Sequence, residues 1–299
     1  MTMSPISSGS LPQGRWVRRA VVGWMAGMLA LGCAGLSSAD EVTKTFTVSG
    51  RAHVKVETDD GAVRVSTGDI KQVEIRVVYT GYKLDKDLRV STDQSGDSVG
   101  VIAKTSGGNF WSWGVRHGSL RVEVHMPKDA DLNVRAGDGS VEADSINGSV
   151  DITTGDGSIT VQGARGTIRF HTGDGHIEAR GLDGNVDASS GDGHINLEGR
   201  FDGLNIRTGD GSVTARAAAG SKVATSWSIH TGDGSVDLEL PGDLQANLDA
   251  STHDGHISSG LQMTVEGSFS SSSIHGKLNG GGPSLTIQTG DGSIHLSKT

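Results

Sequence analysis

The sequence contains a single cysteine, Cys33, so a disulfide within one chain is excluded. Aromatic residues make up only 4% of the 299 residues, which suits a narrow core that has room for Val, Ile, Leu and Ala but for few rings. No hydrophobic run after the N-terminal segment is long enough to span a bilayer. The sequence also has no nucleophile motif, no Cys/His pair and no phosphate loop. These absences argue against most classes of enzyme.

Basic residues are in the minority: 26 Lys and Arg stand against 35 Asp and Glu, a net charge of −9. Loss of residues 1–39 would remove three arginines and no acidic residue, which moves the net charge to about −12. An acidic surface disfavours nucleic acid and anionic lipid as partners, and it permits cation binding.

The N-terminal segment has the pattern of a secretory signal. Three arginines precede an apolar run at 20–31, and small residues at 37–39 come directly before Asp40. We therefore predict a signal peptide over residues 1–39, with cleavage after Ala39 favoured. In the alternative, residues 29–33 form a degenerate lipobox and Cys33 is lipidated. Either route predicts a periplasmic, outer-envelope or secreted protein that contacts a membrane only through a lipid anchor.

The dominant pattern is a Gly-Asp-Gly tripeptide that recurs every 18 residues, with looser copies at Asp233, Asp254 and Asp291. A period of this length indicates a stacked repeat architecture. The central residues of the regular copies are Asp138, Asp156, Asp174, Asp192 and Asp210.

Apolar residues occupy the same offsets from each of these aspartates: plus 3, plus 5, plus 12 and plus 14. Alternation at a period of two predicts strands with one buried face. Each 18-residue unit therefore holds two short strands, one after Gly-Asp-Gly and one after a second glycine such as Gly166. Glycine at both corners is expected to supply positive φ angles.

Stacking such units predicts an all-β fold, a parallel β-solenoid whose equivalent strands pair about 4.8 Å apart. Residues 131–299 form the repeat solenoid, with 258–284 expected to hold a degenerate coil and a loop. Residues 40–130 lack the repeat but contain alternating segments, and we expect them to form an irregular N-terminal β cap. Residues 40–299 are then a single domain.

Three features together resemble the bacterial putative-adhesin family of β-strand-repeat proteins. They are the Thr-Gly-Asp-Gly-Ser-Ile repeat, the segment 122–132 before the first coil, and the ending 276–287 followed by a last Gly-Asp-Gly. The resemblance covers roughly residues 45–297. It implies an exported or envelope-associated β-solenoid of undefined function and carries no catalytic residues.

In register, the aspartates stack along one corner, where neighbours repel by about 0.9 kcal/mol in water. Calcium bound by carboxylate and carbonyl oxygens would offset this repulsion. The five aspartates of the regular repeats are therefore candidate calcium ligands. In the alternative, each Asp accepts hydrogen bonds from the glycine amides of its own turn.

Two histidines follow the Gly-Asp-Gly tripeptide in adjacent repeats, His176 and His194, and should stack. They are either a zinc site with nearby carboxylates or solvated turn residues. Threonines before the tripeptide form a further column, which we interpret as a corner feature rather than a flat ice-binding array.

Phe110, Trp111 and Trp113 lie close together in a glycine-bounded segment. Exposed aromatics of this kind mark binding surfaces. The alternative is that they plug the N-terminal end of the stack.

The sequence therefore predicts a non-catalytic adhesin-like protein for adhesion, envelope scaffolding or partner recognition. The partner would be a protein or glycan of the cell envelope. A carbohydrate-active β-helix enzyme is the alternative, and it requires one coil to bring acidic residues together in a groove.

Overall fold

The computed structural model describes residues 39–106, 118–265 and 270–299, and all their regular elements are β-strands. Four strands of 13 or 14 residues carry the regular repeats. They are β9 (Val141–Thr154), β10 (Ile159–Thr172), β11 (Ile177–Ser189) and β12 (Ile195–Thr208).

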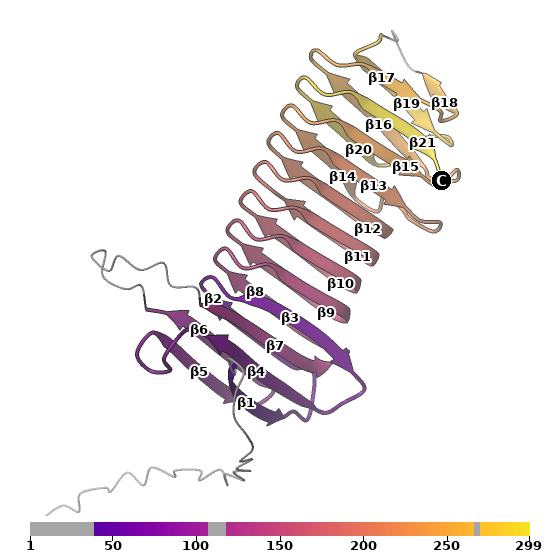
Figure 1. Cartoon of the computed structure of the whole chain (residues 1–299). Helices are drawn as coiled ribbons and strands as arrows, with labels where there is room; N and C mark the ends of the chain where they lie inside the picture. Colours follow the sequence, from indigo (N-terminus) through magenta and orange to yellow (C-terminus); the bar gives the residue numbers. More distant parts are fainter. Residues whose placement is uncertain (1–38, 107–117, 266–269) are drawn as a thin grey trace, which may run out of the picture. The chain divides into compact units, whose positions relative to one another are not determined.

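Consecutive repeats pair in parallel and in register, so that Ile159 lies beside Ile177 and Ile177 beside Ile195. Figure 1 shows these coils stacked one on the next. The predicted parallel solenoid is therefore confirmed. The two short strands expected in each repeat run together as one strand, because pairing with the neighbouring coil continues around the bend between them.

The first and second halves of each long strand belong to two opposite faces, which we name face A and face B. Face A runs, in order of pairing, β1-β4-β7-β3-β9-β10-β11-β12-β13-β15-β21-β17. Face B runs β5-β6-β2-β8-β9-β10-β11-β12-β14-β20-β16-β19-β18.

The remaining strands build the two ends of the stack. At the N-terminal end they are β1 (Asp40–Thr47), β2 (Ala52–Thr58), β3 (Ala62–Gly68), β4 (Gln72–Thr80), β5 (Leu88–Ser95), β6 (Ser98–Thr105), β7 (Ser119–Pro127) and β8 (Ala130–Ala136). At the C-terminal end they are β13 (Val213–Ala217), β14 (Ser226–Thr231), β15 (Val236–Leu240), β16 (Ala246–Thr252), β17 (Ile257–Ser259), β18 (Met263–Val265), β19 (Ser273–Leu278), β20 (Ser284–Thr289) and β21 (Ile294–Lys298).

The core lies between the two faces and follows the predicted period of two. In the second repeat, Ile159 and Val161 from face A meet Ile168 and Phe170 from face B, and each is at most 1% exposed. Complete burial of such a side chain contributes roughly 1.5–3 kcal/mol. Because every coil repeats this set, the core is continuous along the stack.

The Gly-Asp-Gly corner needs glycine for a reason other than the predicted one. None of its glycines has a positive φ. A Cβ on Gly157 would instead overlap the carbonyl oxygen of Gly139 in the preceding coil, and one on Gly155 would lie 2.9 Å from the oxygen of Gly137. Close backbone approach between coils therefore excludes a side chain. Positive φ is found at the other corner, where Gly166 has a φ of 124°.

A buried hydroxyl precedes each Gly-Asp-Gly turn and binds it to the coil before. Thr172 Oγ1 donates toward the carbonyl oxygens of Gly155 and Gly157, at 3.2 and 2.9 Å, and accepts the N–H of Gly175 at 3.2 Å. Equivalent hydrogen bonds to carbonyl oxygens recur along the column from Thr154 onward, whereas the hydroxyl of Thr58 has no partner among the described residues. The threonine column therefore faces the interior, as expected of a corner feature rather than an ice-binding array, and its buried members are Thr58, Thr154, Thr172, Ser190, Thr208, Thr231, Thr252 and Thr289.

Chain order and stacking order differ at both ends. The coil β2–β3 lies between β6–β7 and β8–β9, and the last coil, β20–β21, lies between β14–β15 and β16–β17. Both insertions keep the parallel register of the regular repeats.

Antiparallel strands finish the stack. At the N-terminal end, β1 pairs with β4 and β5 with β6, in line with the predicted irregular cap. At the C-terminal end, β19 pairs antiparallel with β16 and β18. The degenerate coil expected within 258–284 is therefore replaced, in the described part of that segment, by antiparallel strands that extend face B beyond β16.

Candidate functional site

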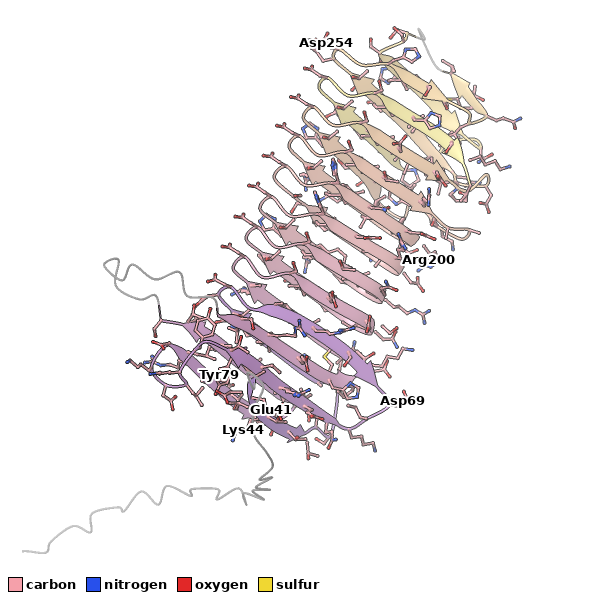
Figure 2. The ribbon with its side chains drawn as sticks, in the orientation of Figure 1. Glu41, Lys44, Asp69, Tyr79, Arg200 and Asp254 are labelled. Carbon is pink, nitrogen blue, oxygen red and sulfur yellow. The ribbon has the colours of Figure 1, made fainter. Side chains whose placement is uncertain are left out.

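The predicted aspartates do form one column, which we name the Asp corner. Figure 2 shows acidic side chains along this edge, with Asp254 labelled near its C-terminal end. The column is longer than the regular repeats, because the contacts between successive corner glycines extend it in both directions. Its members, all exposed, are Asp60, Asp138, Asp156, Asp174, Asp192, Asp210, Asp233, Asp291 and Asp254.

These carboxylates do not cap their own turns. The amide of Gly173 donates to the carbonyl oxygen of Gly155, and that of Gly175 to the hydroxyl of Thr172. The alternative in which Asp accepts the turn amides is therefore wrong. Among the described residues, no three His, Cys, Asp or Glu side chains come together as a metal-binding group. The calcium site at the Asp corner stays a prediction.

His176 and His194 stack as predicted, with ring centroids 5.2 Å apart and planes inclined by 17°. The Nδ1 atom of His176 accepts the N–H of His194 at 3.2 Å, and Nδ1 of His194 accepts the N–H of Ser212 at 3.1 Å. Each ring thus bonds to the backbone of the next coil. This arrangement assigns the pair a role in coil-to-coil contact.

Two groups of predicted site residues lie outside the described residues. They are the aromatic residues Phe110, Trp111 and Trp113, and the lipidation candidate Cys33. Both remain predictions. Among the described residues, no helix is long and apolar enough to cross a membrane.

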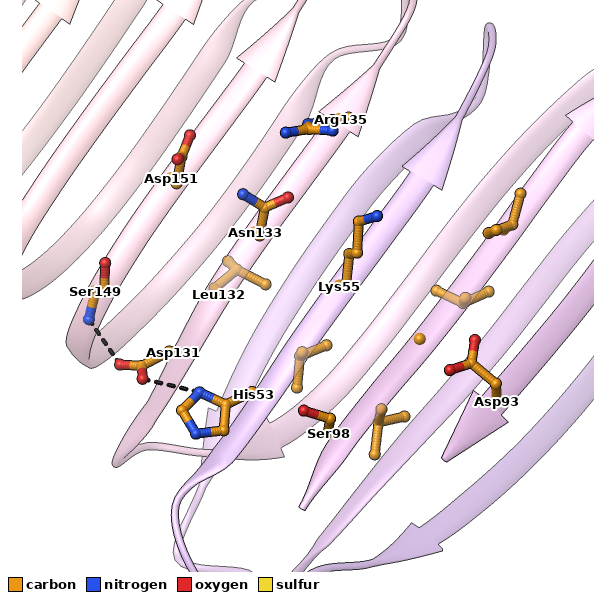
Figure 3. A pocket seen from close by; sticks show the side chains of 15 residues that line it. His53, Lys55, Asp93, Ser98, Asp131, Leu132, Asn133, Arg135, Ser149 and Asp151 are labelled. Atoms are coloured by element: carbon orange, nitrogen blue, oxygen red, sulfur yellow. Dashed lines mark hydrogen bonds and ion pairs between the residues drawn. The ribbon is translucent and has the colours of Figure 1, made fainter. Parts of the chain in front are cut away.

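A hollow lies on the outer side of face B, near the N-terminal end. It measures about 570 Å³ and is lined by β2, β5, β6, β8 and β9. Figure 3 shows its central row, in which Asp93, Lys55, Asn133 and Asp151 follow one another across neighbouring strands. Between Asp93 and Lys55 this row passes through Gly100, where a Cβ would lie only 2.5 Å from Asp93 Oδ1, so the glycine makes room for that carboxylate. We name this hollow the face B depression.

Asp131, at one edge of the depression, is fully engaged. It accepts hydrogen bonds from the N–H of Ser149 at 2.9 Å and from Arg51 Nε at 3.0 Å, and its other oxygen lies 3.0 Å from His53 Nδ1. Burial raises the pKa of this carboxyl, but the Ser149 hydrogen bond and the Arg51 guanidinium outweigh burial and hold the pKa below its usual value. Asp131 therefore organises the edge of the depression.

Asn133, in the middle of the row, differs from Asp131 because its side-chain oxygen has no hydrogen-bond partner in the described part of the chain. Its Oδ1 atom is buried and accepts no hydrogen bond from any described residue. Buried polar atoms almost always have a partner, so an exception requires an explanation. Lys55, beside it, forms an ion pair with Glu57 at 2.7 Å and is not that partner.

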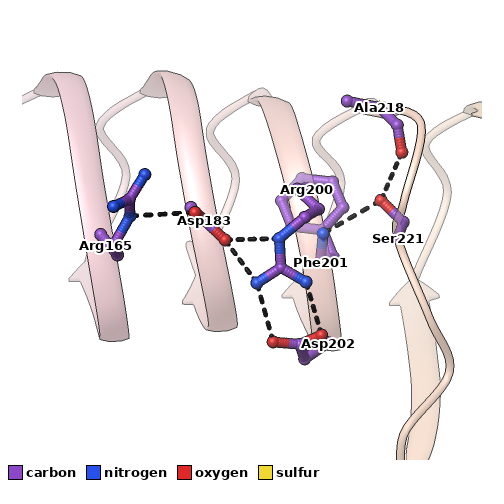
Figure 4. A network of polar contacts seen from close by, with 7 residues as sticks. All are labelled: Arg165, Asp183, Arg200, Phe201, Asp202, Ala218 and Ser221. Carbon is purple, nitrogen blue, oxygen red and sulfur yellow. Dashed lines mark hydrogen bonds and ion pairs between the residues drawn. The ribbon is translucent and has the colours of Figure 1, made fainter.

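A second polar cluster lies at the bends of three coils, opposite the Asp corner (Figure 4). Arg200 Nη1 lies 2.6 Å from Asp202, and its Nε donates to Asp183 at 2.5 Å, while Arg165 Nε lies 2.9 Å from Asp183. Hydrogen bonds to Asp202 and Asp183 raise the pKa of Arg200 further above its ordinary value. Every charge in this cluster has a partner, so the cluster binds coils together.

Two of these features were not predicted from the sequence, the place of Asp60 in the Asp corner and the face B depression. Asp60 could have been found, since Thr58-Asp59-Asp60-Gly61 differs from the Thr-Gly-Asp-Gly repeat only at its second residue. The face B depression could not. It depends on β2 lying between β6 and β8, and no periodicity in the sequence encodes that order.

The family described as Toastrack DUF4097 matches residues 51–297. Among solved structures, a "putative lipid binding protein" from Parabacteroides distasonis is similar over 86% of this chain and 96% of its own, at 16% identity and a TM-score of 0.50. At this identity the likeness concerns the fold alone.

Two further solved structures are similar at lower TM-scores. A "putative cell adhesion protein" from Clostridium sporogenes has a TM-score of 0.32 at 13% identity, covering 88% of this chain and 100% of its own. A "putative adhesin" from Bacteroides fragilis has a TM-score of 0.34 at 8% identity, covering 88% and 99%. A search of curated proteins found no match.

Proposed function

Because the chain belongs to the Toastrack DUF4097 family, we propose that it is an exported, non-catalytic β-solenoid that binds an envelope partner through its regular outer surface. The adhesin resemblance carried by the Gly-Asp-Gly repeat agrees with this family. Adhesion and envelope scaffolding are the two forms that this role takes.

The observation that carries the proposal is the parallel stacking of β9 to β12, which stays in register on both faces and shifts only at the bend between β11 and β12. It turns single outward residues into columns, such as Thr160, Glu178 and Asn196 on face A. A periodic surface of this kind suits long, shallow contacts with a partner. Among the described residues, only Leu84 and Val265 are exposed large hydrophobics, so the contacts would be polar.

Shortening the stack tests the proposal. Beads coated with residues 40–299 should retain isolated bacterial envelope fragments better than albumin-coated beads. Removing residues 159–176, one complete repeat, rejoins equivalent positions and should lower retention while the protein stays folded. Retention equal to that of albumin would contradict the proposal.

Export is tested separately, at the N-terminus. We propose cleavage after Ala39, with lipidation at Cys33 as the alternative. Mass spectrometry of the protein from its native host should find Asp40 as the first residue. An acylated Cys33 would instead indicate a tethered protein, and an intact residue 1 would contradict export.

A further inference from the structure

We infer that the face B depression is a binding site for a neutral oligosaccharide. This inference rests on the proposed function and names the chemistry of its partner. The site consists of the row Asp93, Lys55, Asn133 and Asp151 on β5, β2, β8 and β9, with Gly100 of β6 as its floor.

The need for a ligand comes from Asn133. Its Oδ1 atom is an acceptor without a donor among the described residues, although Asn133 lines the face B depression. The flexible Lys55 beside it can move aside, whereas the backbone around it is fixed by pairing with β2 and β9. A ligand hydroxyl that donates to Oδ1 would remove the cost of leaving a buried acceptor unpaired.

The class of ligand follows from the order of groups along the row. Carboxylates at Asp93 and Asp151 accept hydrogen bonds, the ammonium of Lys55 donates, and the amide of Asn133 does both. Adjacent strands lie about 4.8 Å apart, so Lys55, Asn133 and Asp151 follow at that spacing, while β6 separates Asp93 from Lys55 by one further strand. Sugar hydroxyls both donate and accept, so a chain of sugar rings laid across the strands can satisfy the row in succession.

The charge of the row favours a neutral sugar over an acidic one. Lys55 is already paired with Glu57, and Arg135 lines the depression outside the row, whereas no described residue forms an ion pair with Asp93 or Asp151. An anionic ligand would approach these two carboxylates inside a protein that already carries a net charge of −9.

The chain offers a matched pair of variants for the test. Asn205 lies on face B in the same outward column as Asn133, and its Oδ1 is also buried and unpaired, but it is outside the depression. Asn133→Ala and Asn205→Ala therefore remove the same side-chain amide at equivalent coil positions; the second also removes the hydrogen bond from Asn205 Nδ2 to Asp187, and only the first changes the site.

The experiment measures binding of neutral hexasaccharides of glucose, mannose and N-acetylglucosamine to residues 40–299 by titration calorimetry, with hexagalacturonate as the anionic counterpart. At least one neutral hexasaccharide should bind at least tenfold more tightly than hexagalacturonate. Asn133→Ala should weaken this binding at least tenfold, and Asn205→Ala less than twofold. Thermal unfolding of both variants checks that each is folded.

No binding of any neutral hexasaccharide, or equal losses in the two variants, would overturn the inference. Retention of envelope fragments separates this from the proposed function. A protein that retains envelope but binds no hexasaccharide overturns the oligosaccharide site alone, and one that does neither overturns both. The hexasaccharide should be recovered intact, because cleavage would favour the enzyme alternative.

Discussion

At the scale of the residue, the corner of each coil is governed by hydrogen bonding between coils. The glycines are required by backbone crowding, and the hydroxyl column supplies the acceptors and donors that the turn needs. The repeat pattern predicted glycine at these positions, but it attributed the glycines to positive φ angles. A sequence pattern does not reveal how closely the backbone of a neighbouring coil approaches.

Thr172→Val tests the hydroxyl column. Valine keeps the shape but leaves the carbonyl oxygen of Gly157 and the N–H of Gly175 without this partner inside the corner. We expect a loss of about 1–3 kcal/mol in the free energy of unfolding. Thr172→Ser should cost much less, since Ser190 occupies the equivalent place in the next coil. Equal stability of the valine variant and the wild type in urea titration would contradict this role.

Asp174→Asn tests the repulsion along the Asp corner. Its exposed carboxylate has one Asp neighbour in the coil on each side, so the variant should be more stable at low salt by about 1 kcal/mol or less. Salt screens exposed charges, so the stability difference between the variant and the wild type should vanish in concentrated NaCl.

If the Asp corner binds calcium, millimolar calcium will raise the midpoint temperature of wild-type unfolding and a chelator will reverse the rise. Identical midpoints in calcium and chelator would end the calcium prediction.

Acid should weaken the edge of the face B depression. The native pKa of Asp131 lies below its usual value, so the unfolded chain takes up the proton first as the pH falls. The stability that this carboxylate contributes is complete above the ordinary carboxyl pKa of about 3.9 and is lost below it. Asp131→Asn should therefore be less stable near neutral pH and show a shallower decline between about pH 5 and 3. If stability falls equally with pH in the wild type and in Asp131→Asn, the lowered pKa of Asp131 is contradicted.

At the scale of the element, the sequence predicts the coils better than their order. Alternation and the 18-residue period identify the core residues of β9 to β12. Alternation and period do not predict that β20–β21 inserts between two earlier coils, because all coils present similar edges and any two can pair.

This insertion makes the last coil a central one. Removal of residues 284–299 should unpair β14 from β20 and β15 from β21 and leave both β16 and β17 without their parallel partner. We expect the cooperative unfolding of the C-terminal half to be lost. The control is a chain without residues 159–176, which keeps every other pairing possible. Because β14 and β15 keep their pairings with β12 and β13, the decisive strand is β17, whose one strand partner among the described residues is β21. Hydrogen exchange protection that persists in β17 after truncation would contradict the insertion.

At the scale of the whole molecule, the fold converts a short repeated sequence into two patterned faces with few exposed hydrophobic side chains among the described residues. Packing and hydrogen bonding between coils explain most of the residues that recur in the repeat. The candidate site arises where the repeat is least regular, at β2, β6 and β8, and the sequence could not reveal it because those strands come together from distant segments.

The central claim is that successive repeats lie in register, one coil on the next. Residues 40–299 lack Cys33, so pairs of cysteines can be introduced without interference. Thr160→Cys with Glu178→Cys places two outward thiols on paired positions, whereas Thr160→Cys with Asn196→Cys separates them by a further coil. Mild oxidation should join the first pair within one chain and leave the second unjoined. Equal oxidation of the two pairs would contradict the stacked register.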